Sequence, residues 1–476
     1  MSSRVKVPSH KPSEPQHVVM LVNNTCVNDS RVIKSAEAIA KTGRAVTIIC
    51  RHSAGLPEEE FRNNVRYRRI APIPFELRNI LDRLRNAFDA PASNSGSLTG
   101  TFIGSVSKIL LGLLFNAFLL VYKILRFFSS NLRRVFEFIR TIGRSLTRGV
   151  KGLWRSILRK TYQFIEADEF MHAAEPHVLK LRPDVIHAHD LTTLPLGGRV
   201  ARKVGSSLIY DSHELEMHRN ATYTNIVKWK RRRLEKKYIR QAESVITVSD
   251  SIADHLRQDY SIKRPNVIFN SPDFVNSKDK TRTLRGDLGF TPEIPLAVYV
   301  GSVTINRGLE EMVRALQYSP QLRFALVGPR RPATESALRM IIDEIAVVDR
   351  VYFIDPVPPE AVVNFISDAS VSVLPIQNVC LSYYYCMPNK LLESVFAGLP
   401  VVVANLFEMA RFVENNKCGL VADETSPEDI ARAIDRVLMN RGQYVLSKES
   451  RNELAREFGW DSQARRLQKI YDEIGH

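Results

Sequence analysis

The hydrophobic positions of this chain fall into short apolar runs that alternate with stretches of helical periodicity. Runs such as residues 45–50, 296–300 and 401–403 are too uniformly apolar for strands with one face in water, so they predict strands buried inside parallel sheets. Between such runs, apolar residues recur at spacings of three and four, as from Val32 to Ala40, which predicts crossover helices. Strand and helix alternate in both halves of the chain. This pattern predicts the α/β class, with two Rossmann-like, doubly wound domains facing a cleft.

Changes in composition divide the chain into a lead, two halves and a tail. Residues 1–16 are polar and contain prolines but no apolar segment, so a disordered lead is expected and no cleaved signal peptide. The first Rossmann-like half is expected at residues 17–274 and the second at 275–450. Residues 451–476 are expected to form a C-terminal helix that packs back towards the first half. The loop at 24–29 contains no glycine, so the dinucleotide-binding fingerprint is missing there, which argues against a dehydrogenase.

Residues 101–165 interrupt the first half with an apolar and strongly basic insertion. Its apolar run, residues 109–122, is shorter than the roughly 20 residues that span a bilayer, so a re-entrant or in-plane anchor is predicted. Residues 131–165 then place apolar side chains on one side of a helical wheel and arginines on the other, the pattern of a helix lying among lipid headgroups. The alternative is a helix that covers a hydrophobic groove of its own protein. The predicted membrane contacts are Leu110, Leu114, Phe118, Arg140, Arg144, Arg148 and Trp154.

Composition and charge narrow the choice of partner. A chain of 476 residues, 44% of them apolar, can bury two cores, because single cores stop growing at roughly 250–300 residues. The formal charge of +16 suggests nucleic acid or an anionic membrane as partner. Residues 101–165 hold twelve lysines and arginines against the single acid Glu137, and this uneven distribution favours a membrane. The chain has five cysteines and no CxxC pair, so neither a disulfide framework nor a zinc ribbon is predicted, and a reducing cytosol fits.

Candidate chemistry in the first half gathers at the carboxyl ends of strands, where open parallel sheets bind ligands. The strand at residues 207–210 leads into Asp211-Ser212-His213-Glu214, where a neutral His213 can relay or accept a proton and Glu214 can orient it. His187 and His189, two apart in a strand, point to the same side. No third ligand stands at a recognisable spacing, so they are predicted to be hydrogen-bonded core histidines, and no metal is expected. The basic helix at residues 228–240 is either a solvated face or a contact for lipid headgroups or an acceptor diphosphate.

In the second half, the loop at residues 301–308 has the character of a phosphate site. A small residue follows the strand, a helix begins near Leu309, and Arg307 is positioned for bidentate contact. The loop therefore predicts an anionic ligand at this end of the second sheet.

Residues 387–403 predict a turn, a short helix and a buried strand in succession. Asn389 can cap the helix, and Lys390 and Glu393 share one helical face beside backbone N–H groups that favour phosphate. An ordinary surface ion pair is the alternative for these two residues.

Several stretches of the sequence together resemble glycosyltransferase family 4, whose members are retaining enzymes of the two-Rossmann GT-B fold. The resemblance covers most of the chain outside the lead and the insertion. Each stretch is weakly specific alone, and their order and spacing carry the resemblance. The stretches are NDSRVIKSAEAIAKTGRAVTII, PDVIHAHD, YDSHE, AESVITVSDSIADHL, YVGSVTINRGLEEMVRAL and PNKLLESVFAGLPVVVA followed by FEM.

The resemblance implies a sugar nucleotide held mainly by the second half, with the acceptor on the first. Glu393 matches the family's ribose-binding glutamate, and Arg307, assisted by Lys390, matches the residue that neutralises the diphosphate. His213 matches the family's histidine at the reacting centre. The implied catalytic residues are His213, Glu214, Arg307 and Lys390; the donor-binding residues are Gly301, Ser302, Arg307, Tyr385, Asn389, Lys390 and Glu393; the acceptor-side residues are Asn23, Asn24, Asp190 and His213.

The sequence also departs from the family pattern at three places. Tyr385 stands eight residues before Glu393, where the family has a glutamate that contacts the donor sugar. Ser302 replaces the usual arginine after the strand glycine, and Asn23-Asn24 replaces a glycine pair on the acceptor side. These departures put the identity of the donor sugar in question.

Taken together, the sequence predicts a retaining hexosyltransferase that moves a sugar from a nucleoside diphosphate donor to a membrane-bound acceptor. A polyprenyl-diphosphate-linked or other lipid-linked acceptor in cell-surface polysaccharide synthesis is expected. A UDP sugar is favoured over a GDP sugar, and neither a metal nor a nucleic acid partner is expected. The expected location is the cytoplasmic side of the inner or plasma membrane, as a peripheral or monotopic protein on an anionic surface. The alternatives are a sugar nucleotide epimerase and a catalytically silent membrane-bound scaffold.

Overall fold

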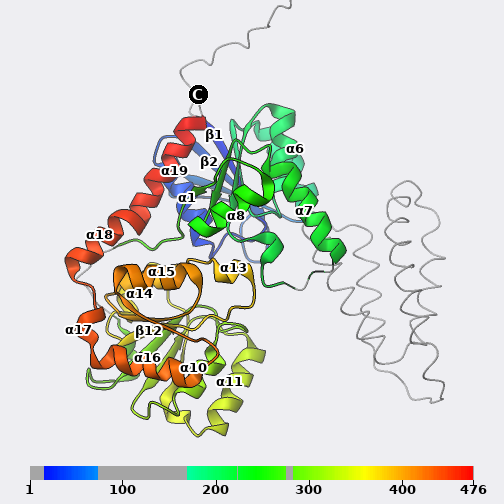
Figure 1. The fold of residues 1–476 in the computed structure, drawn as a ribbon. Helices are drawn as coiled ribbons and strands as arrows, with labels where there is room; N and C mark the ends of the chain where they lie inside the picture. Colours follow the sequence, from blue (N-terminus) through cyan, green and yellow to red (C-terminus); the bar gives the residue numbers. More distant parts are fainter. Residues whose placement is uncertain (1–15, 73–168, 222, 224, 275–281, 475–476) are drawn as a thin grey trace, which may run out of the picture. The chain divides into compact units, whose positions relative to one another are not determined.

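The computed structural model of the protein describes residues 16–72, 169–221, 223, 225–274 and 282–474 (Figure 1). The described residues before Pro72 and after Ala173 belong to one compact unit that contains two β-sheets. In this described part, no helix combines the length and the apolarity needed to cross a bilayer. Nearly all of the expected lead (1–16) and the whole insertion (101–165) lie outside the described residues, and with them Leu110, Leu114, Phe118, Arg140, Arg144, Arg148 and Trp154.

The first sheet has eight strands in the order β3-β4-β2-β1-β5-β6-β7-β8. All neighbours are parallel except β3 with β4. The strands are β1 His17–Leu21, β2 Ala45–Arg51, β3 Glu59–Arg62, β4 Val65–Ile70, β5 Val185–His189, β6 Ser207–Ser212, β7 Ser244–Thr247 and β8 Asn266–Val267. The helices of this half are α1 Ser30–Ala40, α6 Leu194–Val204, α7 Asn225–Ile239 and α8 Asp250–Tyr260, with a 3₁₀ turn, η1, at Glu216–His218.

The second sheet has six parallel strands in the order β11-β10-β9-β12-β13-β14. The strands are β9 Leu296–Val300, β10 Arg323–Val327, β11 Val351–Ile354, β12 Val371–Leu374, β13 Val401–Ala404 and β14 Gly419–Ala422. The helices are α9 Leu284–Leu288, α10 Leu309–Ala315, α11 Pro332–Glu344, α12 Val362–Ile366, α13 Leu381–Tyr384, α14 Asn389–Phe396, α15 Phe407–Asn416, α16 Pro427–Met439, α17 Arg441–Tyr444, α18 Lys448–Phe458 and α19 Trp460–Ile474, with a 3₁₀ turn, η2, at Val348–Arg350. Two parallel α/β sheets confirm the predicted fold class.

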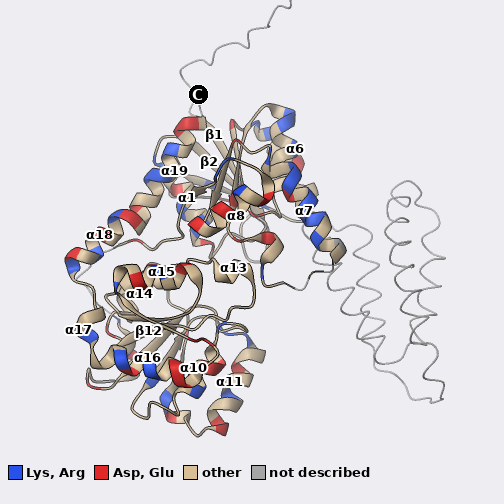
Figure 2. Ribbon diagram, viewed as in Figure 1, with Lys and Arg blue, Asp and Glu red and all other residues tan. Residues whose placement is uncertain are grey.

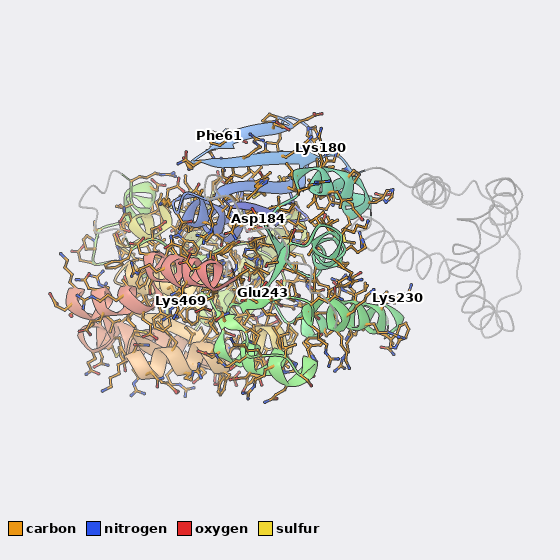
Figure 3. All side chains as sticks on the ribbon, turned by 90° about the horizontal axis from the view of Figure 1, so that it is seen from above. Phe61, Lys180, Asp184, Lys230, Glu243 and Lys469 are labelled. Atoms are coloured by element: carbon orange, nitrogen blue, oxygen red, sulfur yellow. The ribbon has the colours of Figure 1, made fainter. Side chains whose placement is uncertain are left out.

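The centre of each sheet is built from the apolar runs that the sequence pattern singled out. In the first sheet, Val18 of β1 stands opposite Val46 of β2 and Val185 of β5, and all three side chains are buried. The start of β1 is held by Asp184, labelled in Figure 3, whose carboxylate accepts a hydrogen bond from the His17 N–H at 2.7 Å. Burial on both faces explains why these strands are apolar without alternation.

The edge of the first sheet is different. Strand β3 exposes Phe61, which is 70% accessible and is labelled in Figure 3. The other three residues of β3, Glu59, Glu60 and Arg62, are all charged. Short, charged edge strands of this kind resist pairing with another chain.

Several helices begin at a polar side chain that caps them. The side chains of Asp29, Ser249 and Ser426 each accept a hydrogen bond from a backbone N–H in the first turn of α1, α8 and α16. The predicted cap at Asn389 is wrong: Pro388 precedes α14, and the Asn389 side chain donates instead to Glu393. An asparagine one position inside the helix is a full turn from the residue four later, so its amide reaches that side chain rather than the backbone.

The last helix of the chain, α19, returns to the first sheet. Figure 1 shows α19 running beside α1, and its residues Leu467, Ile470 and Tyr471 are buried in the same apolar core as β1 and β2. The Tyr471 hydroxyl also lies 2.8 Å from His187 Nδ1 on β5. The C-terminal helix therefore supports the strand that carries His187 and His189.

Candidate functional site

A cavity of about 650 Å³ lies at the carboxyl ends of strands from both sheets. Ligands of open parallel sheets bind at such strand ends. Residues of the first half that line the cavity include Asn24, Asp29, Arg31, His213, Glu214 and Asn270, and those of the second half include Arg307, Ser382, Tyr383, Cys386, Met387, Asn389 and Lys390. Of the residues implied by the sequence, Asn24, His213, Glu214, Arg307, Asn389 and Lys390 therefore share one cavity, whereas Asn23, Asp190, Gly301, Ser302, Tyr385 and Glu393 do not line it.

Lys390 reaches the cavity across the glycine that ends β9. Gly301 has φ +135°, and a Cβ atom built there would lie 2.2 Å from Lys390 Cε. Any larger residue would displace the lysine. The Lys390 ammonium donates to Asn389 Oδ1 at 3.2 Å, and burial, reinforced by Arg307 and opposed by Glu393, lowers the pKa of Lys390. A cation that is desolvated and close to a second cation gains from an anionic partner.

Arg307 is set in place by its neighbours in the loop between β9 and α10. The following residue, Gly308, has φ +66°, and a Cβ there would overlap the Pro375 carbonyl oxygen. The Arg307 guanidinium lies 5.1 Å from the centroid of the Tyr383 ring, and its Nε is buried without a hydrogen-bond partner. Since buried N–H groups are normally paired, this donor suits an anionic ligand.

Glu393 does not line the cavity, although it lies close to Asn389 and Lys390, which do. Its side chain is 7% exposed and accepts a hydrogen bond from Asn389 Nδ2 at 2.8 Å. Burial, opposed by Lys390 and the Asn389 hydrogen bond, raises the pKa of Glu393. The Asn389 amide thus connects Glu393 to Lys390, since its oxygen accepts from the lysine. The implied ribose contact of Glu393 stays a prediction.

The two departures from the family pattern in this half are placed away from the cavity lining. Tyr385 offers its carbonyl to the Ser249 hydroxyl at 2.7 Å, and its ring packs against Tyr384 and Phe407. Ser302 is exposed, and its carbonyl accepts a hydrogen bond from the Tyr299 hydroxyl. The tyrosine at the cavity is instead Tyr383, which sequence reasoning missed because it relied on spacing from Glu393.

On the first half, His213 is surrounded by acids. Its Nδ1 lies 3.5 Å from Asp190 Oδ2, and its Nε2 lies 3.3 Å from Asp211 Oδ2 and 3.2 Å from His189 Nδ1. Burial alone would lower the pKa of His213, but the carboxylates of Asp190 and Asp211 raise it to about 9. The expectation of a neutral His213 is therefore corrected: at neutral pH it is an imidazolium that donates hydrogen bonds. The two acids that raise this pKa lie at strand ends: Asp190 follows β5, and Asp211 is near the end of β6.

Glu214 does not orient His213, contrary to expectation. Its carboxylate lies 3.4 Å from Arg219 Nη2, and burial raises the pKa of Glu214 although Arg219 opposes this. The Glu214 carboxylate pairs with Arg219, and Asp190 and Asp211 hold the histidine instead.

The Asn23-Asn24 pair sits where β1 ends. Asn24 forms an internal turn, donating to Asp29 at 2.8 Å and accepting from the Cys26 N–H at 2.7 Å. The Asn23 side-chain oxygen is buried without a hydrogen-bond partner. These contacts order the loop that forms the first-half wall of the cavity.

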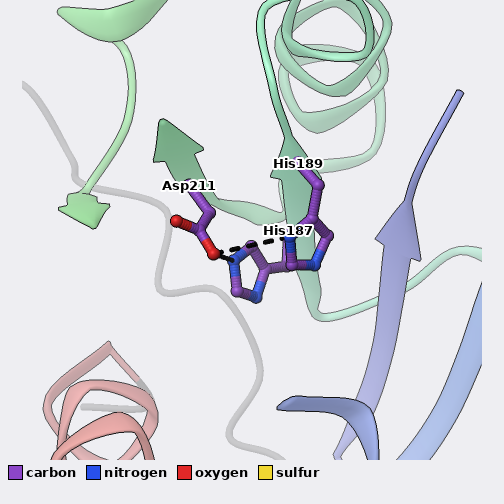
Figure 4. Close-up of side chains that lie close together, drawn as sticks. All are labelled: His187, His189 and Asp211. Atoms are coloured by element: carbon purple, nitrogen blue, oxygen red, sulfur yellow. Dashed lines mark ion pairs between the residues drawn. The ribbon is translucent and has the colours of Figure 1, made fainter. Parts of the chain in front are cut away.

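Asp211 is the centre of a buried cluster with His187 and His189 (Figure 4). Arg31 donates to both carboxylate oxygens, each at 2.8 Å, and its third nitrogen donates to the Ile268 carbonyl at 2.8 Å. Although burial opposes it, Arg31 and His213 hold the pKa of Asp211 well below its ordinary value. The sequence analysis placed Asp211 at a strand end without assigning it a role, and it missed Arg31, although NDSRV contains it.

The structure also revises the metal argument at this cluster. Asp211 lies close enough to His187 and His189 to be a third metal ligand, which the sequence spacing did not reveal. However, both carboxylate oxygens already accept from the Arg31 guanidinium, and His187 Nδ1 lies 2.8 Å from the Tyr471 hydroxyl. The carboxylate is thus occupied by an ion pair that fixes the His213 loop, while His187 Nε2 and His189 Nε2 are buried without a hydrogen-bond partner.

Hydrogen bonds join the two halves beside the cavity. The Leu215 N–H donates to the Ser382 hydroxyl at 3.2 Å, and the Ser251 N–H donates to Glu408 at 2.8 Å. With the Ser249–Tyr385 contact, they bring the His213 loop and the start of α8 against α13 and α15. The positions of Arg307 and His213 across the cavity depend on these contacts.

Models of two glycosyltransferase families match consecutive parts of the chain. Residues 280–457 match "Glycosyl transferases group 1", and residues 127–273 match "Glycosyltransferase Family 4". Among curated proteins, an uncharacterized glycosyltransferase of Methanocaldococcus jannaschii is 24% identical over 305 residues, covering 60% of this chain and 75% of its own. A D-inositol 3-phosphate glycosyltransferase of Acidothermus cellulolyticus is 27% identical over 309 residues, covering 60% and 66%.

Solved structures share the fold over nearly the whole chain. Sucrose-phosphate synthase from Thermosynechococcus elongatus superposes with a TM-score of 0.66 at 17% identity, covering 97% of this chain and 99% of its own. HepE from Anabaena, solved with UDP-glucose, superposes with a TM-score of 0.62 at 12% identity, covering 96% and 100%. The two-sheet architecture, the cavity at the strand ends and the family matches agree. The chain is a nucleotide-sugar-dependent glycosyltransferase of the GT-B fold, similar in consecutive parts to these two glycosyltransferase families.

Proposed function

We propose that the enzyme transfers a hexose-type sugar, with retention, from a UDP sugar to a lipid-linked acceptor at an anionic membrane surface. The observation that carries the donor side is the pair of half-buried cations, Lys390 and Arg307, on the second-half wall of the cavity. The Arg307 Nε lacks a protein partner, and Lys390 bonds only an amide oxygen among the contacts described here. Both are therefore available to the diphosphate.

The charge of the leaving group defines the role of the cations on this side of the cavity. As the bond between sugar and diphosphate breaks, negative charge builds up on the phosphate oxygens, and cations already in place stabilise it without reorganisation. Lys390 and Arg307 carry this role, and the Tyr383 ring fixes the plane of the guanidinium. In a same-face reaction a donor phosphate oxygen takes the acceptor proton, so no protein base is needed on the acceptor side.

His213 has a different role in this scheme. Because Asp190 and Asp211 raise its pKa to about 9, it meets the substrates as a cation. Its two ring N–H groups face the carboxylates of Asp190 and Asp211, so it attracts a donor or acceptor oxygen through its positive charge. An imidazolium cannot serve as a general base, which agrees with proton transfer to the donor phosphate.

The choice of UDP is supported by the solved structure of HepE, which was obtained with UDP-glucose. The lipid-linked acceptor, its use in cell-surface polysaccharide synthesis and the location on the cytoplasmic face of the membrane rest on the basic, apolar insertion at residues 101–165. Basic α7, whose lysines and arginines are marked in Figure 2, adds positive charge to the first half. Two of its arginines are already paired within the protein, Arg231 with Glu216 and Arg232 with Asp259.

The decisive experiment offers a panel of sugar nucleotides with polyprenyl-diphosphate-linked acceptors to the wild type and to Arg307→Ala and Lys390→Ala. Each substitution is expected to lower kcat/KM by roughly 100-fold or more, the usual cost of losing one donor to a developing anion. Lys469→Ala and Arg339→Ala are the matched controls, because both side chains are largely exposed on α19 and α11. Turnover near wild type in both cavity variants would show that the leaving group binds elsewhere.

The same panel separates the alternatives. An epimerase would convert the sugar nucleotide in the absence of any acceptor. A catalytically silent scaffold would bind neither UDP nor GDP in a calorimetric titration.

A further inference from the structure

A second group of metal-ligand side chains lies outside the cavity, between η1 and α8. His218 ends η1, while His255 and Asp259 stand one turn apart on α8. One ligand atom from each residue lies within 4.8 Å of the others. His255 Nε2 is 3.8 Å from Asp259 Oδ2, and the rings of His218 and His255 meet edge to face with centroids 5.1 Å apart. The three side chains thus converge on one point at the protein surface.

The spacing matches what a tetrahedral ion needs. Residues four apart on a helix point to the same side, so His255 and Asp259 form a ready two-ligand face. Zinc bonds of about 2.0–2.1 Å to nitrogen and oxygen place neighbouring ligand atoms about 3.3 Å apart. The side chains need only small rotations to reach this spacing, and His218 is exposed and has room to move.

An unsatisfied atom marks the site. His255 Nε2 is shielded from solvent and has no hydrogen-bond partner, since the Asp259 oxygen at 3.8 Å is beyond hydrogen-bond reach. Buried polar atoms are normally paired, so an orphan aimed at another ligand group calls for an explanation. A bound cation supplies one, because it would coordinate both groups at once.

The cluster at Asp211 also contains buried histidine nitrogens without partners, His187 Nε2 and His189 Nε2, but it differs in what binds its carboxylate. There the Arg31 guanidinium occupies both carboxylate oxygens in a site that is 2–4% exposed. At Asp259 the competing cation is Arg232, which is 57% exposed and reaches a single oxygen at 3.3 Å. Exposed pairs of this kind contribute at most about 1 kcal/mol, so a divalent ion displaces the arginine easily.

We propose that His218, His255 and Asp259 bind one borderline divalent transition-metal ion of the zinc type, with water in the fourth position. The imidazole and carboxylate donors favour zinc over magnesium or calcium, which prefer all-oxygen ligand sets. The ion would tie η1 to α8. Both elements adjoin the contacts between the halves, Leu215 with Ser382 and Ser249 with Tyr385. Metal binding would therefore stiffen the loop that follows His213, a role separate from the transfer reaction.

The test uses the full-length protein after removal of metals with a chelator. Titration with Zn²⁺ is expected to show one tight ion per chain, and Co²⁺ to give the visible absorption bands of a tetrahedral nitrogen- and oxygen-ligated ion. His218→Ala, His255→Ala and Asp259→Asn should each weaken zinc binding by more than about tenfold, since even partners of metal ligands cost this much. His177→Ala, a partly exposed histidine on another helix, is the matched control and should bind as the wild type does.

His218→Ala is the variant that keeps the proposal falsifiable, because an exposed side chain is not needed for folding. Unchanged zinc affinity in this variant, or in folded His255→Ala, would overturn the assignment. The absence of a tightly bound ion in the wild type would also overturn the assignment. Loss of zinc binding in His189→Gln would overturn it too, because the ion would then belong to the Asp211 cluster.

Discussion

Asp211 and His213 face each other across 3.3 Å at the end of β6, and this contact sets the charge of the first-half wall of the cavity. Asp211 can stay ionised although it is buried, because Arg31 binds both of its oxygens. The carboxylate in turn keeps His213 protonated. Arg31, Asp211 and His213 together therefore determine whether the reacting centre presents a neutral base or a positive charge.

The raised pKa of His213 predicts a specific loss of stability as pH rises. A group whose pKa is higher in the folded state stabilises the fold fully below its unfolded pKa, near 6.5, and this contribution disappears as pH passes the folded value of about 9. A shift of this size corresponds to about 3 kcal/mol. The difference in unfolding free energy between wild type and His213→Gln should thus shrink from pH 6 to pH 10 in chemical denaturation. A difference that does not depend on pH would contradict the imidazolium.

Arg31→Met is expected to destabilise the protein strongly. It would leave the Asp211 carboxylate buried without its cation, which costs roughly 3–5 kcal/mol. Arg432→Met is the matched control, because Arg432 is 72% exposed and its pair with Asp429 should contribute less than about 1 kcal/mol. Chemical denaturation followed by tryptophan fluorescence measures both. Equal stability of the two variants would mean that the buried pair does not anchor the His213 loop.

Gly301→Ala tests the position of Lys390. The added methyl group would lie 2.2 Å from Lys390 Cε at a φ of +135°, so both steric conflict and backbone strain are expected. UDP affinity, measured by calorimetry, should fall at least tenfold, because the lysine is pushed out of place. Gly442→Ala is the control, since nothing lies within 4 Å of a Cβ at that position. If Gly301→Ala binds UDP like the control, Lys390 does not contact the diphosphate.

Tyr383 and Tyr385 can be told apart by their effect on the donor. Tyr383→Leu removes the ring on which Arg307 rests, and cation–π contacts contribute about 0.5–2 kcal/mol, so UDP should bind roughly 2- to 30-fold more weakly. Tyr383→Phe keeps the ring and should bind nearly as the wild type does. Tyr385→Phe should leave UDP binding unchanged, because the Tyr385 ring lies against Tyr384 and Phe407. A strong loss in Tyr385→Phe would restore the role that sequence spacing suggested for it.

Deleting residues 101–160 should release the protein from membranes while UDP binding persists. The reason is that the excess of basic and apolar residues is concentrated in this segment, whereas the cavity is lined by residues outside it. Flotation with vesicles containing anionic lipid measures the first effect and calorimetry the second. A folded deletion protein that has lost UDP binding would contradict the separation of the two functions.

Local physics explains why much of this fold follows from the sequence alone. The strand at Leu296–Val300 begins and ends at the predicted residues, because a strand buried on both faces needs a continuous apolar run. Caps such as Ser426 act within one turn and depend only on neighbouring residues.

The chemistry of the site was decided by contacts between residues far apart in the chain. The sequence identified Arg307, Lys390 and His213, since their residue types and loop positions are local features. It could not reveal the charge of His213, because the partner that keeps Asp211 ionised, Arg31, is 180 residues away in the sequence. Nor could it choose Tyr383 over Tyr385, because contacts from Ser249 and Leu215 across the two halves orient that segment. Electrostatics and side-chain direction depend on distance in space, which only the tertiary structure supplies.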